Sequence, residues 1–348
     1  MIIGFTYNLK PCLPAGMAKK FDIGDKEAEF YAEFDTPETI KAIEEAIVAN
    51  GYKVIRIEAN ELAYNKLRRL RNKIDLVFNF AEAASKSADR EAHIPMFCEI
   101  LHIPYTGPGP LSAALILNKA RAKEIWDYYG VPTPPFQVFY TTEEKLDPAL
   151  KFPLIAKTNG QGSSSGVRNK SVVKNQKELR ETVTELMDQF KEPVLVEKFL
   201  SGREFTIPIL GNDGDLWALP IAESNFKALP KGVNRIDSYE AKWIWDDPSN
   251  PLEAMICPAK ISNDLKNEIV NTAKKAFITI GCRDWARIDL RLDGKGKLYV
   301  LEINCPVGLL PDLKENSKLP RSAHEAGLNF DQLIGKIIEI AKKRLNLP

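Results

Sequence analysis

The stretch Ala286-Arg-Ile-Asp-Leu-Arg-Leu-Asp-Gly-Lys-Gly-Lys-Leu-Tyr-Val-Leu-Glu-Ile-Asn304 predicts a β-hairpin. Apolar and polar residues alternate on both sides of the turn residues 293–296, which is typical of two strands that each have one buried face. Because successive side chains of a strand point to opposite faces, Arg287, Asp289 and Arg291 share one face of the first strand.

The same face of the hairpin predicts a metal site. With a loop of four residues, Asp289 is expected opposite Val300 and Arg287 opposite Glu302, so that Asp289 lies diagonally from Glu302. Asn304 shares the face of Glu302, and two carboxylates with an amide oxygen form a set that suits Mg²⁺, particularly with nucleotide phosphates completing the shell. The alternative is a solvated hairpin face with an Arg–Glu pair. The interruption of the apolar pattern by Glu302 and Asn304 favours the metal site.

Upstream, a loop rich in glycine and serine follows a strand and predicts a phosphate site. It reads Lys157-Thr-Asn-Gly-Gln-Gly-Ser-Ser-Ser-Gly166. Glycines let backbone N–H groups approach an anion closely, the serine hydroxyls add donors, and Lys157 adds a positive charge. The loop is not a Walker A loop, because no Gly-Lys-Ser/Thr ends it. The alternative is a plain linker.

A third motif lies between these two, Val194-Leu-Val-Glu-Lys-Phe-Leu-Ser-Gly-Arg-Glu-Phe-Thr-Ile207. A hydrophobic strand ends in Glu197 and Lys198, and Glu204 begins the next strand. Polar groups at strand ends beside a phosphate loop suit the recognition of adenine and ribose. The alternative is an ordinary strand end with a solvated salt bridge.

The periodicity of the remaining chain predicts an α/β protein. In the first part, strands and helices alternate, which indicates a parallel sheet covered on both faces: strands at 1–5, 52–57, 73–80 and 102–107, helices from 35 to 51 and at 92–101, with an irregular stretch at 6–34. Further on we expect helices at 115–130, 177–190, 263–280 and 338–345, strands at 136–140, 152–157, 193–199 and 204–210, and a turn-rich stretch from 211 to 258.

Composition excludes several classes of protein. The 348 residues allow two or three domains, and 48 basic against 47 acidic residues exclude a strongly basic nucleic-acid binder as the default. No apolar run has the roughly 20 residues that a membrane helix needs, and no signal peptide is recognised at the start. The five cysteines lack a CxxC spacing and the three histidines lack a metal-binding spacing. We therefore expect a reduced, cytoplasmic protein.

Taken in order, these motifs resemble the D-alanine–D-alanine ligase family of ATP-grasp enzymes. The resembling segments are IPYTGPG at 103–109, Asn118-Lys119, KTNGQGSSSG at 157–166, VEKFLSGREFT at 196–206, YEAKW at 239–243, CPA at 257–259, GCRDWARIDLRLD at 281–293 and LEIN at 301–304. The resemblance implies an α/β (α+β) chain with an N-terminal α/β domain at 1–115, a central ATP-grasp subdomain at 116–212 and a C-terminal catalytic subdomain at 213–348.

The resemblance also implies a role for individual residues. Those matching contacts to ATP are Lys119, Lys157, Ser164, Ser165, Glu197, Lys198, Phe199, Glu204 and Lys242. Those matching catalytic positions are Arg287, Ser163 and Lys242, and those matching magnesium ligands are Asp289, Glu302 and Asn304. ATP and Mg²⁺ are thus the implied cofactors, with two ions expected and Mn²⁺ as a possible substitute.

The implied activity is ligation of a carboxylate to an amine. Phosphorylation by ATP converts the carboxylate to an acyl phosphate, which the amine attacks, and ADP and phosphate are released. The expected partners are small carboxylate and amine substrates, such as amino acids, and a second copy in a homodimer, with no nucleic acid and no membrane. Three alternatives stay open: strict D-alanyl-D-alanine synthesis, a non-catalytic nucleotide-binding regulator on the same fold, and phosphoryl transfer to a stable product.

The substrate half departs from the family pattern. After Phe5 the chain reads Thr-Tyr-Asn-Leu-Lys-Pro, without the family's Gly-Gly-x-Ser-x-Glu, and Asn79-Phe-Ala-Glu82 stands in place of a His-Gly loop. After Asn304 it reads Cys-Pro-Val-Gly-Leu-Leu. We therefore expect a diverged ligase. Glu82, Arg90 and Glu91 are candidates for substrate contacts, because charged residues after a strand end face the usual ligand crevice, with a solvated loop as the alternative.

Overall fold

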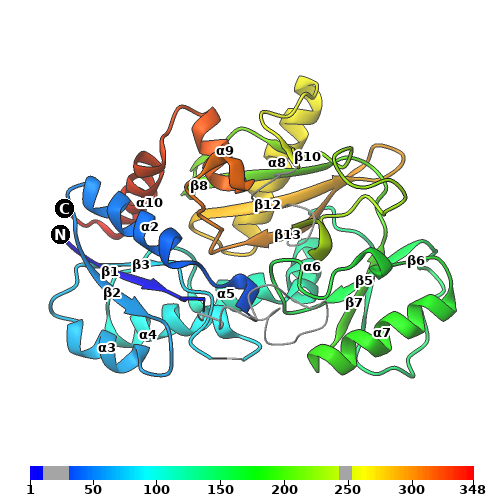
Figure 1. The fold of residues 1–348 in the computed structure, drawn as a ribbon, viewed down its shortest axis with the longest axis horizontal. Helices are drawn as coiled ribbons and strands as arrows, with labels where there is room; N and C mark the ends of the chain where they lie inside the picture. The colour runs from blue at the N-terminus through cyan, green and yellow to red at the C-terminus, as the bar shows by residue number, and fades with distance from the viewer. Residues whose placement is uncertain (11–30, 86, 243–252) are drawn as a thin grey trace.

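The computed structural model describes residues 1–10, 31–85, 87–242 and 253–348. Cys12 and Trp243 lie outside these residues. Within them, three β-sheets are arranged around the centre of the molecule, each with its own helices (Figure 1).

The first sheet is parallel, as predicted, with the strand order β2 (Lys53–Glu58), β1 (Ile2–Tyr7) and β3 (Leu76–Asn79). Its helices are α2 (Pro37–Ala49), α3 (Ala63–Leu70) and α4 (His93–Leu101), followed by α5 (Pro110–Leu117) and α6 (Lys119–Tyr128). Helix α2 begins two residues after the expected start at 35, because the side chain of Thr36 accepts a hydrogen bond from the backbone N–H of Thr39 and Pro37 occupies the first helical position.

The second sheet is antiparallel, with the order β4 (Phe136–Phe139), β7 (Val194–Lys198), β5 (Leu154–Thr158) and β6 (Val172–Val173). Helix α7 (Gln176–Phe190) packs its apolar residues against one face, and Leu179, Val183 and Leu186 are buried there with Val194 and Val196. This sheet presents the ends of β5 and β7 to the centre of the molecule.

The third sheet contains β11 (Met255–Ile256), β10 (Ala222–Ser224), β8 (Glu204–Asn212), β12 (Asp284–Leu292) and β13 (Leu298–Asn304) in that order, with β9 (Asp215–Ala218) paired to β8. Helices α8 (Asn263–Thr279), α9 (Lys318–Glu325) and α10 (Phe330–Leu345) complete this part. Helix α10 lies beside α2 of the first part (Figure 1), where Tyr52 donates a hydrogen bond to Glu339 over 2.7 Å. The last helix of the chain therefore packs against the first domain-like part, next to α2.

Several local predictions were wrong in their bounds. The expected strand at 102–107 is a single bridge between Val77 and Tyr105. The expected helix at 115–130 is two helices separated at Asn118, whose side chain caps the second by accepting from the Arg121 N–H. Helix α10 begins eight residues before the expected start at Ile338, and α3 and α9 were not predicted.

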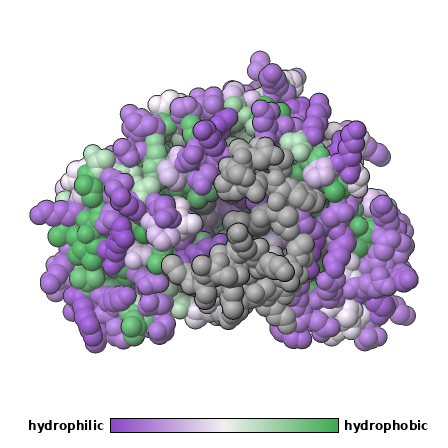
Figure 2. Space-filling model, in the orientation of Figure 1, coloured by the Kyte–Doolittle hydropathy of each residue, from purple (hydrophilic) through white to green (hydrophobic). Residues whose placement is uncertain are grey.

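The hydrophobic core follows the sheets, and its largest buried side chains are Trp126, Trp285, Phe5, Phe78 and Phe80. The face seen in Figure 2 carries mainly hydrophilic side chains. In the part of the chain that the structure describes, no helix combines the length and apolar character that a membrane crossing requires. The three domain ranges stay a prediction, and β8, from the expected central range, pairs with strands of the C-terminal range.

Candidate functional site

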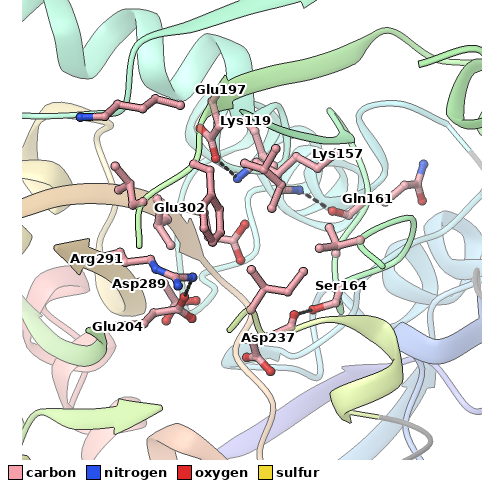
Figure 3. Close-up of a pocket in the computed structure, with 18 of the residues that line it drawn as sticks. Lys119, Lys157, Gln161, Ser164, Glu197, Glu204, Asp237, Asp289, Arg291 and Glu302 are labelled. Atoms are coloured by element: carbon pink, nitrogen blue, oxygen red, sulfur yellow. Dashed lines mark hydrogen bonds and ion pairs between the residues drawn. The ribbon is translucent and has the colours of Figure 1, made fainter. Parts of the chain in front are cut away.

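A first cavity lies where the second and third sheets face each other (Figure 3). Strands β5 and β7 supply one wall, and β12 and β13 supply another. The predicted residues that line it are Lys119, Lys157, Ser164, Glu197, Lys198, Phe199, Glu204, Lys242, Asp289 and Glu302. Residues from three separate motifs of the sequence therefore come together in one place.

One side of this cavity contains a buried carboxylate between two lysines. Glu197 Oε1 lies 2.7 Å from Lys157 Nζ and Glu197 Oε2 lies 2.8 Å from Lys123 Nζ. Burial would raise the pKa of Glu197, but the two ammonium groups outweigh it and lower that pKa. Burial lowers the pKa of Lys123 to about 8, although Glu197 opposes the shift. The sequence did not point to Lys123, because a lysine within a helix is usually exposed.

The opposite side of the cavity holds a second buried ion pair. Arg291 Nη1 lies 2.9 Å from Glu204 Oε2, and the guanidinium stands between the rings of Phe199 and Phe226, 5.3 and 5.0 Å from their centroids. Arg291 also donates to the backbone oxygen of Arg235. This arrangement fixes Glu204 at the cavity wall (Figure 3).

The hairpin exists, but its predicted register was wrong. Asp289 is directly opposite Glu302, and Arg287 is opposite Asn304, instead of Val300 and Glu302 respectively. The loop has five residues, since Leu292 pairs with Leu298, and a bulge follows between Asp289 and Leu290. The loop and the bulge together displace the pairing by two residues. The two carboxylates are thereby brought closer in register than the sequence pattern implied.

The environment of Asp289 fits a cation bound jointly with a phosphate ligand. Its carboxylate accepts from Thr206 Oγ1 at 2.6 Å and Asn304 Nδ2 at 3.3 Å, and Arg287 Nη2 lies 2.8 Å away. Burial would raise the pKa of Asp289, but Arg287 lowers it overall, so the group is an anion. Among the described residues there is no group of three His, Cys, Asp or Glu side chains that could hold a metal alone. Mg²⁺ commonly takes one or two carboxylates and completes its shell with substrate phosphates, and Asp289, Glu302 and Asn304 suit that mode.

The glycine- and serine-rich loop lines both the first cavity and its neighbour, through residues 161–164. Ser163 and Ser164 adopt positive φ angles of 48° and 60°, and Ser164 Oγ donates to the backbone oxygen of Asp237 at 2.7 Å. Ser165 is buried at 2% exposure and lines neither this cavity nor the next one. A residue from the N-terminal part of the chain holds the loop in place, because the backbone N–H of Gly162 donates a hydrogen bond to Glu33 over 2.5 Å.

A second cavity adjoins the first and is lined by both acidic and basic side chains. Glu33, Glu82 and Glu91 line it, and Lys119, Lys242 and Arg287 line it as well, together with Ser163, Glu302 and Asn304. Burial raises the pKa of Glu91 to about 8, in spite of the neighbouring Arg90, and Glu91 Oε2 is a buried atom that has no hydrogen-bond partner among the residues that the structure describes. Burial also raises the pKa of Glu82, with Glu91 adding to the shift.

Of the three candidates from the departing segment, Glu82 and Glu91 line the second cavity, whereas Arg90 does not. Arg90 instead pairs with Glu33, and it donates to the backbone oxygen of Gly160 at 2.9 Å. Glu33 was missed, since it lies in the stretch read as irregular and no local pattern singles it out.

A cluster of charges also escaped the sequence analysis. Asp237 Oδ2 lies 2.9 Å from Lys318 Nζ and 3.5 Å from Lys242 Nζ. Burial would raise the pKa of Asp237, but the two lysines hold it well below its usual range. Lys318 is 76 residues from Lys242 along the chain, so only the tertiary fold brings both lysines to one carboxylate.

Comparisons with known proteins agree with this geometry. Residues 125–339 match the family model described as the D-ala D-ala ligase C-terminus. The D-alanine–D-alanine ligase of Haemophilus influenzae (strain PittEE) is 30% identical over 92% of this chain and 99% of its own length. The corresponding ligase of Actinobacillus succinogenes is 29% identical over 86% of this chain and 91% of its own.

The fold has solved counterparts. The crystal structure of D-alanine–D-alanine ligase from Bacillus anthracis complexed with ATP superposes with a TM-score of 0.71 and 22% identity, and covers 99% of both chains. This likeness confirms the predicted ATP-grasp architecture of mixed helices and sheets. The sequence matches span most of the chain, and the solved structure shares its fold. The chain therefore belongs to the D-alanine–D-alanine ligase family, and it is an ATP-dependent ligase that forms carbon–nitrogen bonds.

Proposed function

We propose that this ligase activates a substrate carboxylate as an acyl phosphate in the second cavity and joins it to an amine. The observation that carries the proposal is the contact between the cavities: Lys119, Lys242 and Glu302 line both. A nucleotide in the first cavity would thus have its terminal phosphate beside a substrate in the second.

In this proposal the first cavity binds ATP. Glu197, Lys198 and Phe199 border the adenine, and Glu204 accepts hydrogen bonds from the ribose hydroxyls. The proposed phosphate contacts are Lys119, Lys157, Lys242 and Ser164, and Ser165, which lines neither cavity, is not among them. The lysines fit this role because point charges at a loop rich in backbone N–H groups stabilise anionic phosphates.

Asp289, Glu302 and Asn304 are the proposed ligands of Mg²⁺, with two ions and with Mn²⁺ as a substitute. Bound there, the cation would supply positive charge to the nucleotide phosphates. The side chains Arg287, Lys242 and Ser163 are the proposed catalytic groups: they line the second cavity and orient and neutralise the carboxylate and the transferred phosphoryl group.

The second cavity suits a donor that carries both an amine and a carboxylate. Its acidic side chains, Glu82 and Glu91, fit an ammonium group, while Lys242 and Arg287 fit a carboxylate. The relatives are named for D-alanine, but the departures around residues 79–91 and after Asn304 lead us to propose a diverged donor or acceptor. Strict D-alanyl-D-alanine synthesis is the second candidate, and the family's named activity favours it.

The test is phosphate release from Mg·ATP in the presence of paired D- and L-amino acids, with mass spectrometry of the products. A ligase releases phosphate only when an amine is present and yields a new amide mass. Hydroxylamine in place of the amine would trap the acyl phosphate as a hydroxamate and report the first half of the reaction. Phosphate transferred to a stable product would indicate a kinase, and ATP binding without turnover would indicate a regulator.

A further inference from the structure

A third cavity adjoins the first one, since Ile236, Asp237 and Lys242 line both. It measures about 1020 Å³ with its open mouth included, against about 680 Å³ for the second cavity. Lys242, Arg287 and Gly308 line both the second and the third cavity. A molecule in the third cavity would therefore reach the place where the proposed acyl phosphate forms.

The walls of this cavity are mainly apolar. Phe226, Leu229, Met255 and Leu310 line it, and each of these side chains is only half-buried in the protein. They come from the turn-rich part of the chain around β10 and β11 and from the segment after β13. Half-buried apolar side chains around one hollow favour an apolar ligand group, because covering them removes apolar surface from water.

Charged side chains also line the cavity. Lys318, Lys242 and Arg287 line it together with two carboxylates, Glu315 and Asp237, and Asp237 pairs with both lysines. The side chain of Lys318 is 15% exposed and that of Arg287 is also 15% exposed, so both are largely shielded from solvent. Arg287 is already paired with Asp289, whereas Lys318 and Lys242 share the one carboxylate of Asp237, so the two lysines can bind an anionic ligand group, such as a carboxylate.

We propose that the third cavity selects the amine-bearing substrate, and that this substrate is an amino acid with an apolar side chain larger than a methyl group. Its side chain lies among Phe226, Leu229, Met255 and Leu310, and its carboxylate pairs with Lys318. Its nitrogen points past Gly308 toward the second cavity. This assignment rests on the proposed function and specifies the second substrate of that reaction.

The bond-forming step balances without another reactant. The neutral amine nitrogen bonds to the acyl carbon, the bond from that carbon to the phosphate oxygen breaks, and its electron pair leaves with phosphate. The proton lost by nitrogen goes to the phosphate, so that an amide and hydrogen phosphate result.

The first experiment measures kcat/KM for a series of acceptor amino acids, with the whole chain and with a donor that has been shown to give a hydroxamate. We expect kcat/KM to rise by about tenfold or more for each added methylene, from glycine and alanine to leucine. Leu229→Trp fills the apolar part and should lower kcat/KM for leucine at least tenfold while glycine is little affected. Hydroxamate formation by the variant shows that it folds and activates the donor.

The second experiment tests the charged side chains. Lys318→Met should raise the KM of leucine about tenfold or more and leave the KM of leucinamide, which lacks the carboxylate, unchanged. Lys314→Met is the matched control, because Lys314 is exposed on the same segment and does not line the cavity.

The outcomes separate the two proposals. If no donor gives a hydroxamate, the proposed ligation fails, and the assignment of the third cavity fails with it. If hydroxamate forms but glycine or alanine is as good an acceptor as leucine, or Leu229→Trp affects all acceptors equally, only the assignment of the third cavity is overturned.

Discussion

Glu33 and Arg90 form a buried ion pair that holds the glycine- and serine-rich loop. Arg90 Nη2 lies 2.7 Å from Glu33 Oε2, and the two side chains are 3% and 5% exposed. Each partner also binds the loop backbone, Glu33 through the N–H of Gly162 and Arg90 through the oxygen of Gly160. The N-terminal part of the chain is thus connected to the loop over the proposed phosphate site.

Arg90→Met should destabilise the protein and weaken ATP binding. Removing the guanidinium leaves the Glu33 carboxylate buried without its cation, which costs about 3–5 kcal/mol. Urea unfolding measures the change, and the KM for ATP should rise because the loop loses an anchor. Arg68→Met, on the exposed side of α3, is the control and should alter neither. Equal stabilities of the two variants would contradict a structural role for the pair.

Glu197→Gln should destabilise the protein more than Lys123→Met. The first change leaves Lys123 and Lys157 buried together without an anion, at a cost of about 3–5 kcal/mol. The second leaves Glu197 with its other partner, Lys157, and removes a lysine whose burial is itself unfavourable, as its pKa of about 8 indicates. The denaturant midpoints of the two variants measure their stabilities, provided that both unfold with the same m-value. A lower stability of Lys123→Met than of Glu197→Gln would contradict the proposed charge balance.

The KM of the donor should depend on pH through Glu91. Its pKa of about 8 means that the carboxyl is largely protonated at pH 7, and Arg90, Glu33, Glu82 and Lys119 are the charged groups around it. Since an ammonium group pairs with the ionised form, the KM should fall about tenfold between about pH 7 and pH 8.5 at saturating ATP. Glu91→Gln should remove this dependence.

The raised pKa of Glu91 also makes the stability of the protein depend on pH, and stability is favoured at low pH, whereas binding of the donor is favoured at high pH. Between its ordinary value of 4.5 and about 8, the folded protein keeps the Glu91 proton that the unfolded chain has lost. The free energy of unfolding contributed by this group is therefore largest below about pH 4.5 and decreases as the pH rises through 8. Relative to Glu91→Gln, the wild-type protein should lose stability across that window, which urea titrations at several pH values measure.

Patterns of local sequence were sufficient for most of the secondary structure and for the first cavity. Period-two alternation predicted β12 and β13, and the glycine-rich loop followed the predicted strand β5. The register of the hairpin was beyond reach, because the bulge at Asp289/Leu290 is a backbone irregularity with no residue pattern of its own. The break at Asn118 was missed because this one residue both ends helix α5 and caps helix α6, so that the two helices follow each other without a loop.

The missed residues of the site share one physical reason. Lys123, Asp237, Lys318 and Glu33 are charged residues that each have a partner far away in the chain, as the separation of 129 positions between Glu33 and Gly162 illustrates. Charged side chains are ordinarily solvated, so composition and spacing assign them to the surface. Only the three-dimensional structure shows that these four side chains are shielded from solvent and paired with opposite charges beside the cavities.

The pair of Glu204 and Arg291 gives the last prediction, on the recognition of ribose. Arg291 fixes the Glu204 carboxylate at 2.9 Å, and two aromatic rings hold the guanidinium in place. If Glu204 accepts the ribose hydroxyls, the wild-type enzyme should discriminate ATP from 2′-deoxy-ATP by about 10- to 100-fold, the range for a hydrogen bond to a charged group. Glu204→Gln should lose most of that discrimination through the KM for ATP, and Arg291→Met should lose part of it, because the carboxylate then moves freely. Arg203→Met breaks an ion pair with Glu223 outside the first cavity and serves as the matched control. Equal use of both nucleotides by the wild-type enzyme would assign Glu204 and Arg291 to the stability of the cavity wall instead of to the nucleotide.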